Sequence, residues 1–356
     1  MVFAVFLLNL FLLILTLINF ATMRRPLAFE EIDASILVLL PVRNEEENIE
    51  RILTELREQS GLSNYQVLVI DDSSEDRTHQ RAAKFESATI SIMSAPEPAP
   101  GWLGKVGALQ AGFRSVSNFD YVISVDADVH FERDAIARAV KTLSRSGLDF
   151  ISPYPRQIAI SWSERLIQPL LQWSWMSTVL LRGTEKIPMK STVICNGQFL
   201  VMKGKSLHAI NGFESVSHKV LDDIELGRSF VAAGFRGAVI DGSAISSTRM
   251  YSSLSQIRAG YGKSLHVAFG SLFGSLIAGS FILFTGVFPL FAALAGNILG
   301  WAALIAIIGT RVLSATASSS RIRDAFAHPA SSLLFIYLLY SSWVNRGKIE
   351  WKGRTV

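Results

Sequence analysis

The sequence predicts an α/β domain with a mainly parallel sheet, joined to transmembrane helices. Two observations lead to this class. Long apolar segments lie at residues 2–20 and 267–308, whereas residues 25–262 have a mixed composition. Within that middle region, short continuous apolar runs alternate with helical patterns, as they do in sheets built from strand–helix–strand units.

The composition is that of a membrane protein. Apolar residues make up 49% of the 356 residues and charged residues 18%, and the mean hydropathy is +0.33. The net charge of +4 comes from scattered basic residues, so we expect anionic lipids or substrates as partners and no nucleic acid. The single cysteine, Cys195, cannot form an internal disulfide, which fits a reducing compartment.

Residues 1–22 predict an uncleaved N-terminal anchor. Arg24 and Arg25 follow the apolar run and no basic residue precedes it, which is the reverse of a secretory signal peptide. The positive-inside rule then places the N-terminus outside and the following domain in the cytoplasm. We therefore expect an integral protein of a bacterial inner membrane.

Residues 263–310 predict a transmembrane helical hairpin with its turn at Gly286–Pro289. Lys263 and Arg311 flank it, so both ends are expected in the cytoplasm. Residues 311–356 are interpreted as a cytoplasmic linker, a short apolar segment at 330–344 and a basic tail. Charge favours a re-entrant or interfacial course for this segment over a crossing, which stays the alternative.

The middle region, residues 23–262, is predicted to hold the α/β domain. Asn44 and Glu47 resemble a capping box before the first helix of this region. Two acidic pairs follow buried strands, and parallel sheets bind ligands at the carboxyl ends of their strands. The strands are expected at 35–40, 66–70, 89–93, 121–125 and from 150, with helices at 49–56, 77–85 and 103–115.

Asp126-Ala127-Asp128 is the sharpest chemical signal. Two carboxylates just past a strand suit Mg²⁺ or Mn²⁺, which prefer oxygen ligands; the alternative is a solvated acidic loop. Asp72 is placed to bind a nucleobase, or else to cap the next helix. Lys105, among glycines, is placed to meet a phosphate, or else faces solvent.

Asp222 and Asp223 stand at a predicted helix start. One carboxylate can cap the helix, and its neighbour can act as a general base if its pKa is raised. Capping alone is the alternative. Gly260-Tyr-Gly-Lys-Ser264 is not a phosphate loop because Ile257 replaces the required glycine, and the six histidines lack zinc spacing.

Taken in order, six stretches resemble glycosyltransferase family 2, with its inverting GT-A fold. They cover roughly residues 35–236. The tail RGKIEWKGR and the stretch RMYSSLSQIRAGYGKS are similar to a membrane-bound subgroup that includes hopanoid-associated and carotenoid glycosyltransferases. The six stretches are PVRNEEENIERIL, VLVIDDSSEDRT, GWLGKVGALQAG, VISVDADVHF, CNGQFLVMKGKSLHAINGF and LDDIELGRSFVAAGF.

The resemblance implies a role for each matching residue. A divalent metal, Mn²⁺ or Mg²⁺, is implied as cofactor, with Asp126, Asp128 and His130 as its ligands. Asp223 is the implied catalytic base, with Asp222 beside it, and Asn196 and Gly197 would border the acceptor. The donor-binding residues would be Pro41, Arg43, Glu45, Asp72, Lys105 and Asp126.

One motif of polymer-forming members is replaced here. The family's Gln/Arg-x-x-Arg-Trp motif corresponds only loosely to residues 256–261, which argues against polymer synthesis. Arg249, Tyr251 and Arg258 are possible substitutes for diphosphate contact. Residues 162–175, rich in tryptophan and leucine, predict an interfacial stretch that guides a lipid, with ordinary core packing as the alternative.

The expected function is transfer of a sugar from a nucleotide donor, UDP-sugar first, to a hydroxyl of a lipid or other membrane acceptor. A candidate base favours a hydroxyl, because a lipid phosphate is already ionised near neutral pH. The alternatives are a polyprenyl-phosphate glycosyltransferase, a nucleotidyltransferase on a similar fold, and a membrane protein that binds nucleotide sugars without catalysis.

Overall fold

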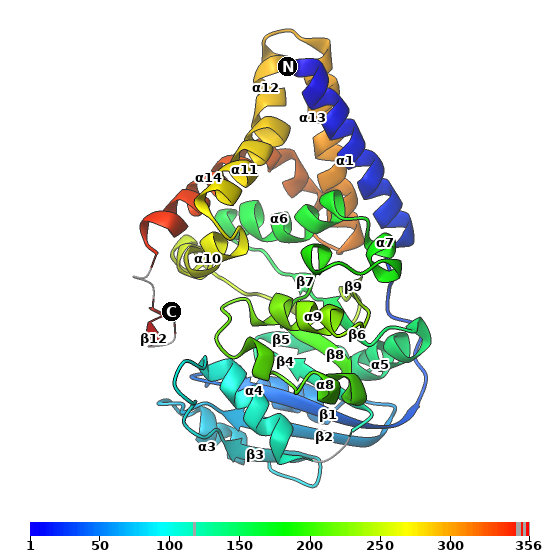
Figure 1. Ribbon diagram of the computed structural model, residues 1–356, viewed down its shortest axis with the longest axis vertical. Coiled ribbons are helices and arrows are strands. Elements are labelled where there is room, and N and C mark those ends of the chain that lie inside the picture. Colours follow the sequence, from blue (N-terminus) through cyan, green and yellow to red (C-terminus); the bar gives the residue numbers. More distant parts are fainter. Residues whose placement is uncertain (117–118, 347–349, 352–353, 356) are drawn as a thin grey trace. The chain divides into compact units, whose positions relative to one another are not determined.

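The computed structural model describes residues 1–116, 119–346, 350–351 and 354–355. The chain packs into two compact units, each built from separate stretches of sequence (Figure 1). We call them the sheet unit, Arg24–Arg156 with Gly183–Thr248, and the helical unit, Met1–Met23 with Gln157–Arg182 and Arg249–Val356. Each unit is described by itself.

The sheet unit has a seven-stranded sheet of order β3-β2-β1-β4-β8-β6-β9 and a three-stranded sheet of order β5-β10-β7. The first four strands of the larger sheet are parallel, β8 is antiparallel to both neighbours, and β6 and β9 are parallel. The predicted mainly parallel sheet is therefore confirmed. The strands are β1 (Ile32–Val42), β2 (Leu62–Asp71), β3 (Ile90–Ser94), β4 (Tyr121–Val125), β5 (Val129–Phe131), β6 (Phe150–Tyr154), β7 (Arg156–Gln157), β8 (Phe199–Lys203), β9 (Gly237–Asp241) and β10 (Ser246–Thr248).

Helices cover both faces of the larger sheet, and alternate residues of β1 show why. Ile36, Val38 and Leu40 face α2 and α5, whereas Leu37 and Leu39 face α4, α8 and α9. Burying one such side chain contributes about 1.5–3 kcal/mol, which accounts for the continuous apolar run. The helices of this unit are α2 (Ile49–Arg57), α3 (Thr78–Ala83), α4 (Gly104–Ser115), α5 (Ala135–Ser146), α8 (Gly204–Ala209), α9 (Asp222–Ala232) and the short η1 (Lys190–Thr192) and η2 (Glu214–Val216). Helix α7 (Leu181–Lys186) begins just before Gly183, where the second stretch of this unit starts.

The expected capping role of Asn44 is wrong. Helix α2 starts at Ile49, and Asn44 lies in the loop before it with a φ of 52°. Its Oδ1 accepts a hydrogen bond from the Glu75 N–H at 2.8 Å. Asparagine tolerates this left-handed backbone, so here it fastens the β1–α2 loop to the β2–α3 loop instead of capping.

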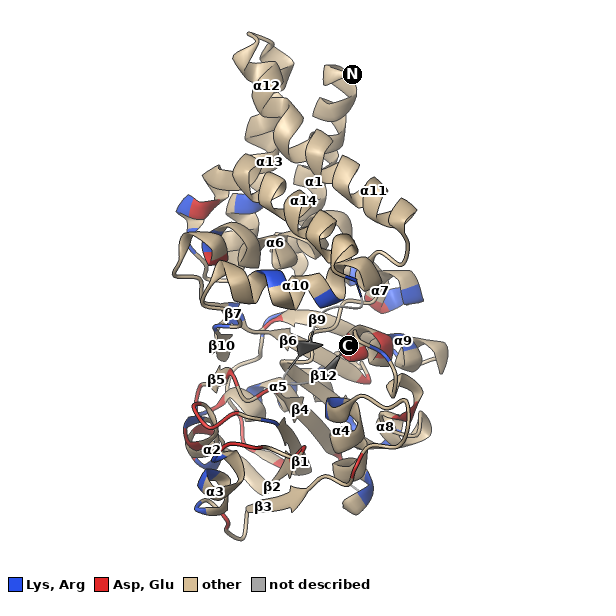
Figure 2. Ribbon diagram, turned by 90° about the vertical axis from the view of Figure 1, so that its left-hand side faces the viewer, with Lys and Arg blue, Asp and Glu red and all other residues tan. Residues whose placement is uncertain are grey.

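Among its described residues, the helical unit contains three helical stretches long and apolar enough to cross a membrane, Val2–Thr22, Leu272–Leu294 and Ile298–Ala317. Figure 2 shows α1, α11 and α12 free of charged side chains. The predicted N-terminal anchor is therefore seen as a single apolar helix. The elements of this unit are α1 (Val2–Thr22), α6 (Trp162–Thr178), α10 (Leu254–Ala268), α11 (Leu272–Ile282), η3 (Leu283–Val287), α12 (Phe288–Leu294), α13 (Ile298–Ala317), η4 (Ile322–Ala327), α14 (His328–Val344), β11 (Glu350–Trp351) and β12 (Arg354–Thr355).

The predicted hairpin is present, but its turn was placed wrongly. Gly286–Pro289 lies inside a continuous helical stretch, where η3 is a π-helical turn. The chain reverses after Leu294, where Gly296 has a φ of 83° and Asn297 caps α13 through the N–H groups of Leu299 and Gly300. Proline is tolerated at the start of α12 because the first N–H groups of a helix need no partner within it.

The helical unit takes up α6 and α10, although residues 23–262, expected to form the α/β domain, include all of α6 and the first part of α10. Trp173 of α6 is 1% exposed and its Nε1 donates to Thr310 Oγ1 of α13 at 2.7 Å. Arg165 of α6 pairs with Asp324 of η4 at 2.6 Å. Core packing therefore explains Trp173, whereas Trp162 at the helix start is 61% exposed. Helix α10 packs against α14.

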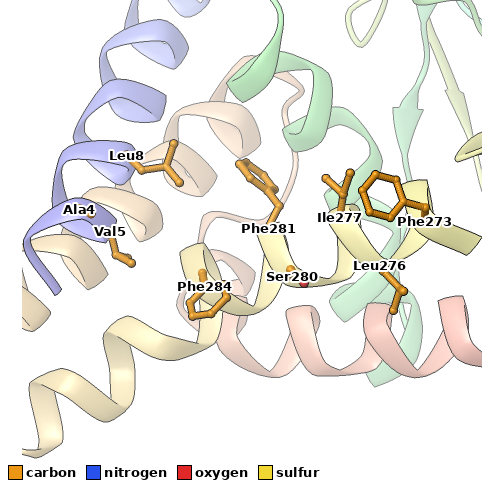
Figure 3. A pocket seen from close by; sticks show the side chains of 9 residues that line it. All are labelled: Ala4, Val5, Leu8, Phe273, Leu276, Ile277, Ser280, Phe281 and Phe284. Carbon is orange, nitrogen blue, oxygen red and sulfur yellow. The ribbon is translucent and has the colours of Figure 1, made fainter. Parts of the chain in front are cut away.

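A groove of about 570 Å³ opens between α1 and α11 (Figure 3). Both helices belong to candidate membrane spans, and Ser280 is the one polar residue that lines the groove. A surface of this kind suits hydrocarbon and offers nothing to a charged group. The other lining residues are Ala4, Val5, Leu8, Phe273, Leu276, Ile277, Phe281 and Phe284.

The C-terminal region is described in part. Helix α14 covers the predicted short apolar segment with 17 residues and is not among the spans found in the described chain. The expected re-entrant or interfacial course of this segment stays a prediction. Of the basic tail, residues 347–349, 352–353 and 356 lie outside the described residues.

Candidate functional site

The candidate residues gather at one edge of the large sheet because β1, β2 and β4 are parallel and in register. Val42 is paired with Asp71, and Leu39 is paired with Ser124. The loops that leave these three strands therefore start at the same edge. They carry the predicted donor-binding residues Arg43 and Glu45, Asp72, and Asp126 with Asp128.

Asp126 and Asp128 have different partners. The Asp126 N–H donates to the Gln198 carbonyl at 3.1 Å, and its Oδ1 lies 2.6 Å from Lys105 Nζ. Asp128 Oδ2 accepts a hydrogen bond from Thr248 Oγ1 at 3.2 Å. Burial, followed by repulsion from Asp126 and Glu45, raises the pKa of Asp128 to about 6.

Lys105 supplies the positive charge of this group. Burial of the ammonium opposes its charged form, but attraction to Asp126, Asp222 and Asp223 outweighs that cost and raises the pKa of Lys105. The lysine at the start of α4 is therefore fully charged at neutral pH. Its ammonium is held by Asp126 at 2.6 Å while 38% of the side chain is exposed, and contact with a phosphate stays a prediction.

Asp222 and Asp223 form the first turn of α9. Asp223 Oδ2 accepts from the Gly197 N–H at 2.8 Å, and its Oδ1 accepts from the Ile224 N–H at 2.7 Å. Burial and the neighbouring Asp222 nevertheless raise the pKa of Asp223 to about 6. Burial also raises the pKa of Asp222, against the attraction of Lys105. A carboxylate with a pKa near neutrality suits a general base.

Asn196 and Gly197 lie in the turn before β8. Both polar atoms of the Asn196 side chain are bonded to Gln198: Oδ1 accepts from its N–H at 2.9 Å, and Nδ2 donates to its Oε1 at 3.0 Å. The Gly197 N–H is held by Asp223. The turn thus lies beside the candidate base; contact with an acceptor stays a prediction.

The predicted nucleoside residues lie at the ends of β1 and β2. Arg43 Nη1 donates to the Asp72 carbonyl at 2.8 Å, which joins the two strand ends, and Pro41 is paired with Ile70 in the sheet. Asp71 stabilises the turn that follows β2, since its Oδ1 accepts a hydrogen bond from the Ser74 N–H at 3.0 Å. Asp72 is 6% exposed.

His130 lies on β5 with its Nδ1 3.1 Å from Glu55 Oε1. Among the described residues, no group of three or more His, Cys, Asp or Glu side chains is arranged to hold a metal ion. Asp126 and Asp128 still offer the oxygen donors that Mn²⁺ and Mg²⁺ prefer, and Glu45 adds a third negative charge nearby. The chemistry of this donor set fits a divalent cation, and His130 as a ligand stays a prediction.

Two of the residues in these contacts were not singled out by sequence reasoning. The Gln198 carbonyl accepts from the Asp126 N–H, and Thr248 bonds to Asp128, 120 positions away. Arg249, next in sequence, lies in the helical unit and pairs with Glu164 at 3.0 Å. Arg258 of that unit donates to Ser341 Oγ at 3.1 Å.

Comparison with known proteins decides the family of this site. Residues 37–209 match the model described as Glycosyl transferase family 2. This part of the chain is a glycosyltransferase family 2 domain. The match includes the Asp126-Ala127-Asp128 motif, Lys105 and the Asn196–Gly197 turn, and it ends before Asp223.

Relatives of the glycosyltransferase domain act on different molecules by name. The 4,4'-diaponeurosporenoate glycosyltransferase of Staphylococcus haemolyticus is 26% identical over 62% of this chain and 58% of its own length. The undecaprenyl-phosphate 4-deoxy-4-formamido-L-arabinose transferase of Photorhabdus laumondii is 31% identical over 35% of this chain and 38% of its own length. The chain thus matches less than two thirds of the length of either relative.

The fold of the chain is also that of a solved structure. The mannosyltransferase PcManGT of Pyrobaculum calidifontis, solved with GDP-Man and Mn²⁺, superposes with a TM-score of 0.54. The alignment covers 97% of this chain and 98% of that one, at 17% identity. The GT-A fold expected from the sequence is confirmed.

Proposed function

We propose that this glycosyltransferase moves a sugar, with inversion, from a nucleoside-diphosphate donor to a hydroxyl of a membrane lipid. The observation that carries the proposal is the arrangement of carboxylates beside Lys105. Its Nζ lies 2.6 Å from Asp126 Oδ1, where it can stabilise negative charge, whereas burial and the neighbouring Asp222 raise the pKa of Asp223 to about 6, which suits a general base.

The chain's residues divide the reaction between them. The acceptor oxygen attacks the anomeric carbon, the bond from that carbon to the diphosphate oxygen breaks, and Asp223 accepts the hydroxyl proton. Lys105 offers a fixed positive charge where the diphosphate leaves. Asp126 and Asp128 would hold a divalent cation, which when bound supplies further neutralisation of the leaving group. Arg43, Glu45 and Asp72 would bind the nucleoside, with UDP as the first choice.

The lipid acceptor is supported by the helical unit. Its three apolar stretches fit a membrane protein, and the groove between α1 and α11 suits a hydrocarbon chain (Figure 3). Arg24 and Arg25 after α1 support a cytoplasmic sheet unit by the positive-inside rule, in keeping with a bacterial inner membrane. A relative named for a carotenoid acid also points to an apolar acceptor.

The test is release of nucleoside diphosphate by the full chain in lipid vesicles with a panel of nucleotide sugars. We expect release to need Mn²⁺ or Mg²⁺ and to fall about 10²-fold or more in Asp223→Asn and Asp128→Ala. Glu58→Gln, at an exposed ion pair with Arg133, is the control and should match the parent. Release of pyrophosphate would indicate a nucleotidyltransferase, and donor binding without release would indicate a non-catalytic protein.

A second candidate is transfer to a polyprenyl phosphate, favoured by the name of the Photorhabdus relative. Such an acceptor is ionised near neutral pH and needs no base. Asp223→Asn therefore separates the two functions. If the variant keeps its rate with polyprenyl phosphate and forms a product labile to mild acid, the hydroxyl acceptor is excluded.

A further inference from the structure

A three-residue turn, Asn196–Gln198, contacts both halves of the candidate site. At its end, the Gln198 carbonyl accepts from the Asp126 N–H at 3.1 Å. At its centre, the Gly197 N–H donates to Asp223 Oδ2 at 2.8 Å. One short backbone segment therefore links the first aspartate of the Asp-x-Asp motif to the candidate base.

The turn is closed by its own side chains. Asn196 uses its amide oxygen and its amide nitrogen on Gln198, with distances of 2.9 and 3.0 Å. Both residues are buried, with 9% and 3% of their surface exposed. Hydrogen bonds out of reach of water hold such a turn in one shape.

Ser152 fixes the turn to the sheet. This residue of β6 is fully buried, and its hydroxyl accepts from the Asn196 N–H at 2.8 Å and donates to the Asn196 carbonyl at 3.2 Å. A hydroxyl can do both at once because it has one donor and two lone pairs. Strand β6 is also paired with β8, which follows the turn, so the anchor and the turn share one sheet.

We propose that Ser152 is a positioning residue that holds the Asn196–Gln198 turn and, through the Gly197 N–H, the carboxylate of Asp223 at a fixed place relative to Asp126. The inference rests on the proposed function, in which Asp223 is the base. Space around Gly197 supports it: a Cβ there would lie 3.3 Å from Asp223 Cβ and 3.5 Å from Lys105 Nζ. A shift of the turn therefore changes the contacts of both Asp223 and Lys105.

The charged and titratable groups that face Asp223 come from three elements. Asp222 is on its own helix, Lys105 is on α4, and the buried Cys195 thiol precedes the turn. The Gly197 N–H favours the charged form of Asp223. Loss of this bond therefore raises the pKa of Asp223, and the acidic limb of the rate profile moves to higher pH.

The experiment compares Ser152→Ala with Ser206→Ala in the full chain. Ser206 is a matched control, since it is fully buried in the same unit and its hydroxyl bonds to Asp149 at 3.1 Å, away from the turn. We expect Ser152→Ala to lower kcat about 10-fold to 10²-fold with little change in donor KM, and to move the acidic limb upward. Ser152→Thr, which keeps the hydroxyl, should restore part of kcat.

Equal kcat and equal pH profiles for the Ser152→Ala and Ser206→Ala variants would overturn the proposal. If Ser152→Ala does not fold, Gly197→Ala tests the same turn from its other side and should lower kcat in a folded protein.

A parent chain without turnover would refute the proposed function alone. The positioning role is then tested by a double-mutant cycle of Ser152→Ala and Asp223→Asn. Thermal denaturation gives the free energy of unfolding of the parent, both single variants and the double variant. Coupling should be present at about pH 8 and absent at about pH 4, where Asp223 is protonated; zero coupling at both values would also overturn it.

Discussion

Adjacent aspartates in α9 meet different surroundings. Asp222 is buried but attracted by Lys105, whereas Asp223 is buried, repelled by Asp222 and held by two backbone N–H groups. The negative charge of Asp222 opposes ionisation of Asp223, so Asp223 keeps its proton to higher pH than an isolated aspartate would. A single residue type thereby provides both a charge partner for the lysine and a base that titrates near neutrality.

At this scale we predict the pH dependence of the reaction. The folded pKa of Asp223 is raised from 3.8 to about 6, so its basic form is lost as the pH falls through about 6. The kcat for nucleoside diphosphate release should therefore have an acidic limb with a midpoint near 6 and drop about tenfold per pH unit below it. The measurement is kcat against pH at saturating metal and donor.

Saturating metal separates the titration of Asp223 from that of Asp128, whose pKa is also raised to about 6. A bound divalent cation favours ionised ligands, so titration of Asp128 moves to lower pH while that of Asp223 remains. Glu58→Gln should keep the parent profile. A midpoint near the ordinary aspartate value, about 4, would contradict the assignment of Asp223 as the base.

Among the elements, α1 is more than a plain apolar anchor. Asn9 is fully buried, and its Nδ2 donates to the carbonyl of Thr285 at 2.9 Å and to that of Ala303 at 3.0 Å. Thr285 lies in the π-helical turn η3, and Ala303 lies in α13. The Asn9 amide nitrogen thus joins α1 to both arms of the hairpin.

We predict that Asn9→Leu weakens the helical unit. It removes both hydrogen bonds while keeping the branching and the number of side-chain heavy atoms, and interhelical bonds of this kind contribute about 0.6 to 1.7 kcal/mol. The measurement is the free energy of unfolding by sodium dodecyl sulfate in mixed micelles. Thr22→Val, which removes a bond only to Ile18 within α1, should change stability less. An equal or more stable Asn9→Leu protein would show that the bonds do not join the helices.

At the scale of the whole molecule, neither unit is a continuous stretch of sequence. The chain starts in the helical unit, enters the sheet unit at Arg24, returns for residues 157–182 and leaves the sheet unit for good after Thr248. A domain drawn from composition at residues 23–262 therefore includes α6 and only the first part of α10. It leaves out α13 and α14, which pack against α6, and α14 also packs against α10.

We predict that a chain cut to residues 23–262 aggregates. Cutting exposes the face of α6 that buries Trp173 and breaks the ion pair of Arg165 with Asp324. Size-exclusion elution in detergent checks this, with the full chain as reference. Replacing Ile167, Leu170 and Trp173 by serine in the cut chain should restore much of the monomer, because these residues belong to the apolar cluster left open. A soluble cut chain without these changes would contradict the packing of α6.

The sequence by itself determined the features that have a local pattern. Strand β4 has the bounds that its apolar run predicts, and the apolar helix α1 and the acidic residues at the strand ends also follow from local patterns. Tertiary structure alone decided the contacts across the chain. Gly197 meets Asp223 over 26 positions, Thr248 meets Asp128 over 120, and α6 packs with the apolar helices. The physical reason is that periodicity repeats every few residues, whereas the partners of a buried hydroxyl, amide or carboxylate depend on which distant elements the sheet brings together.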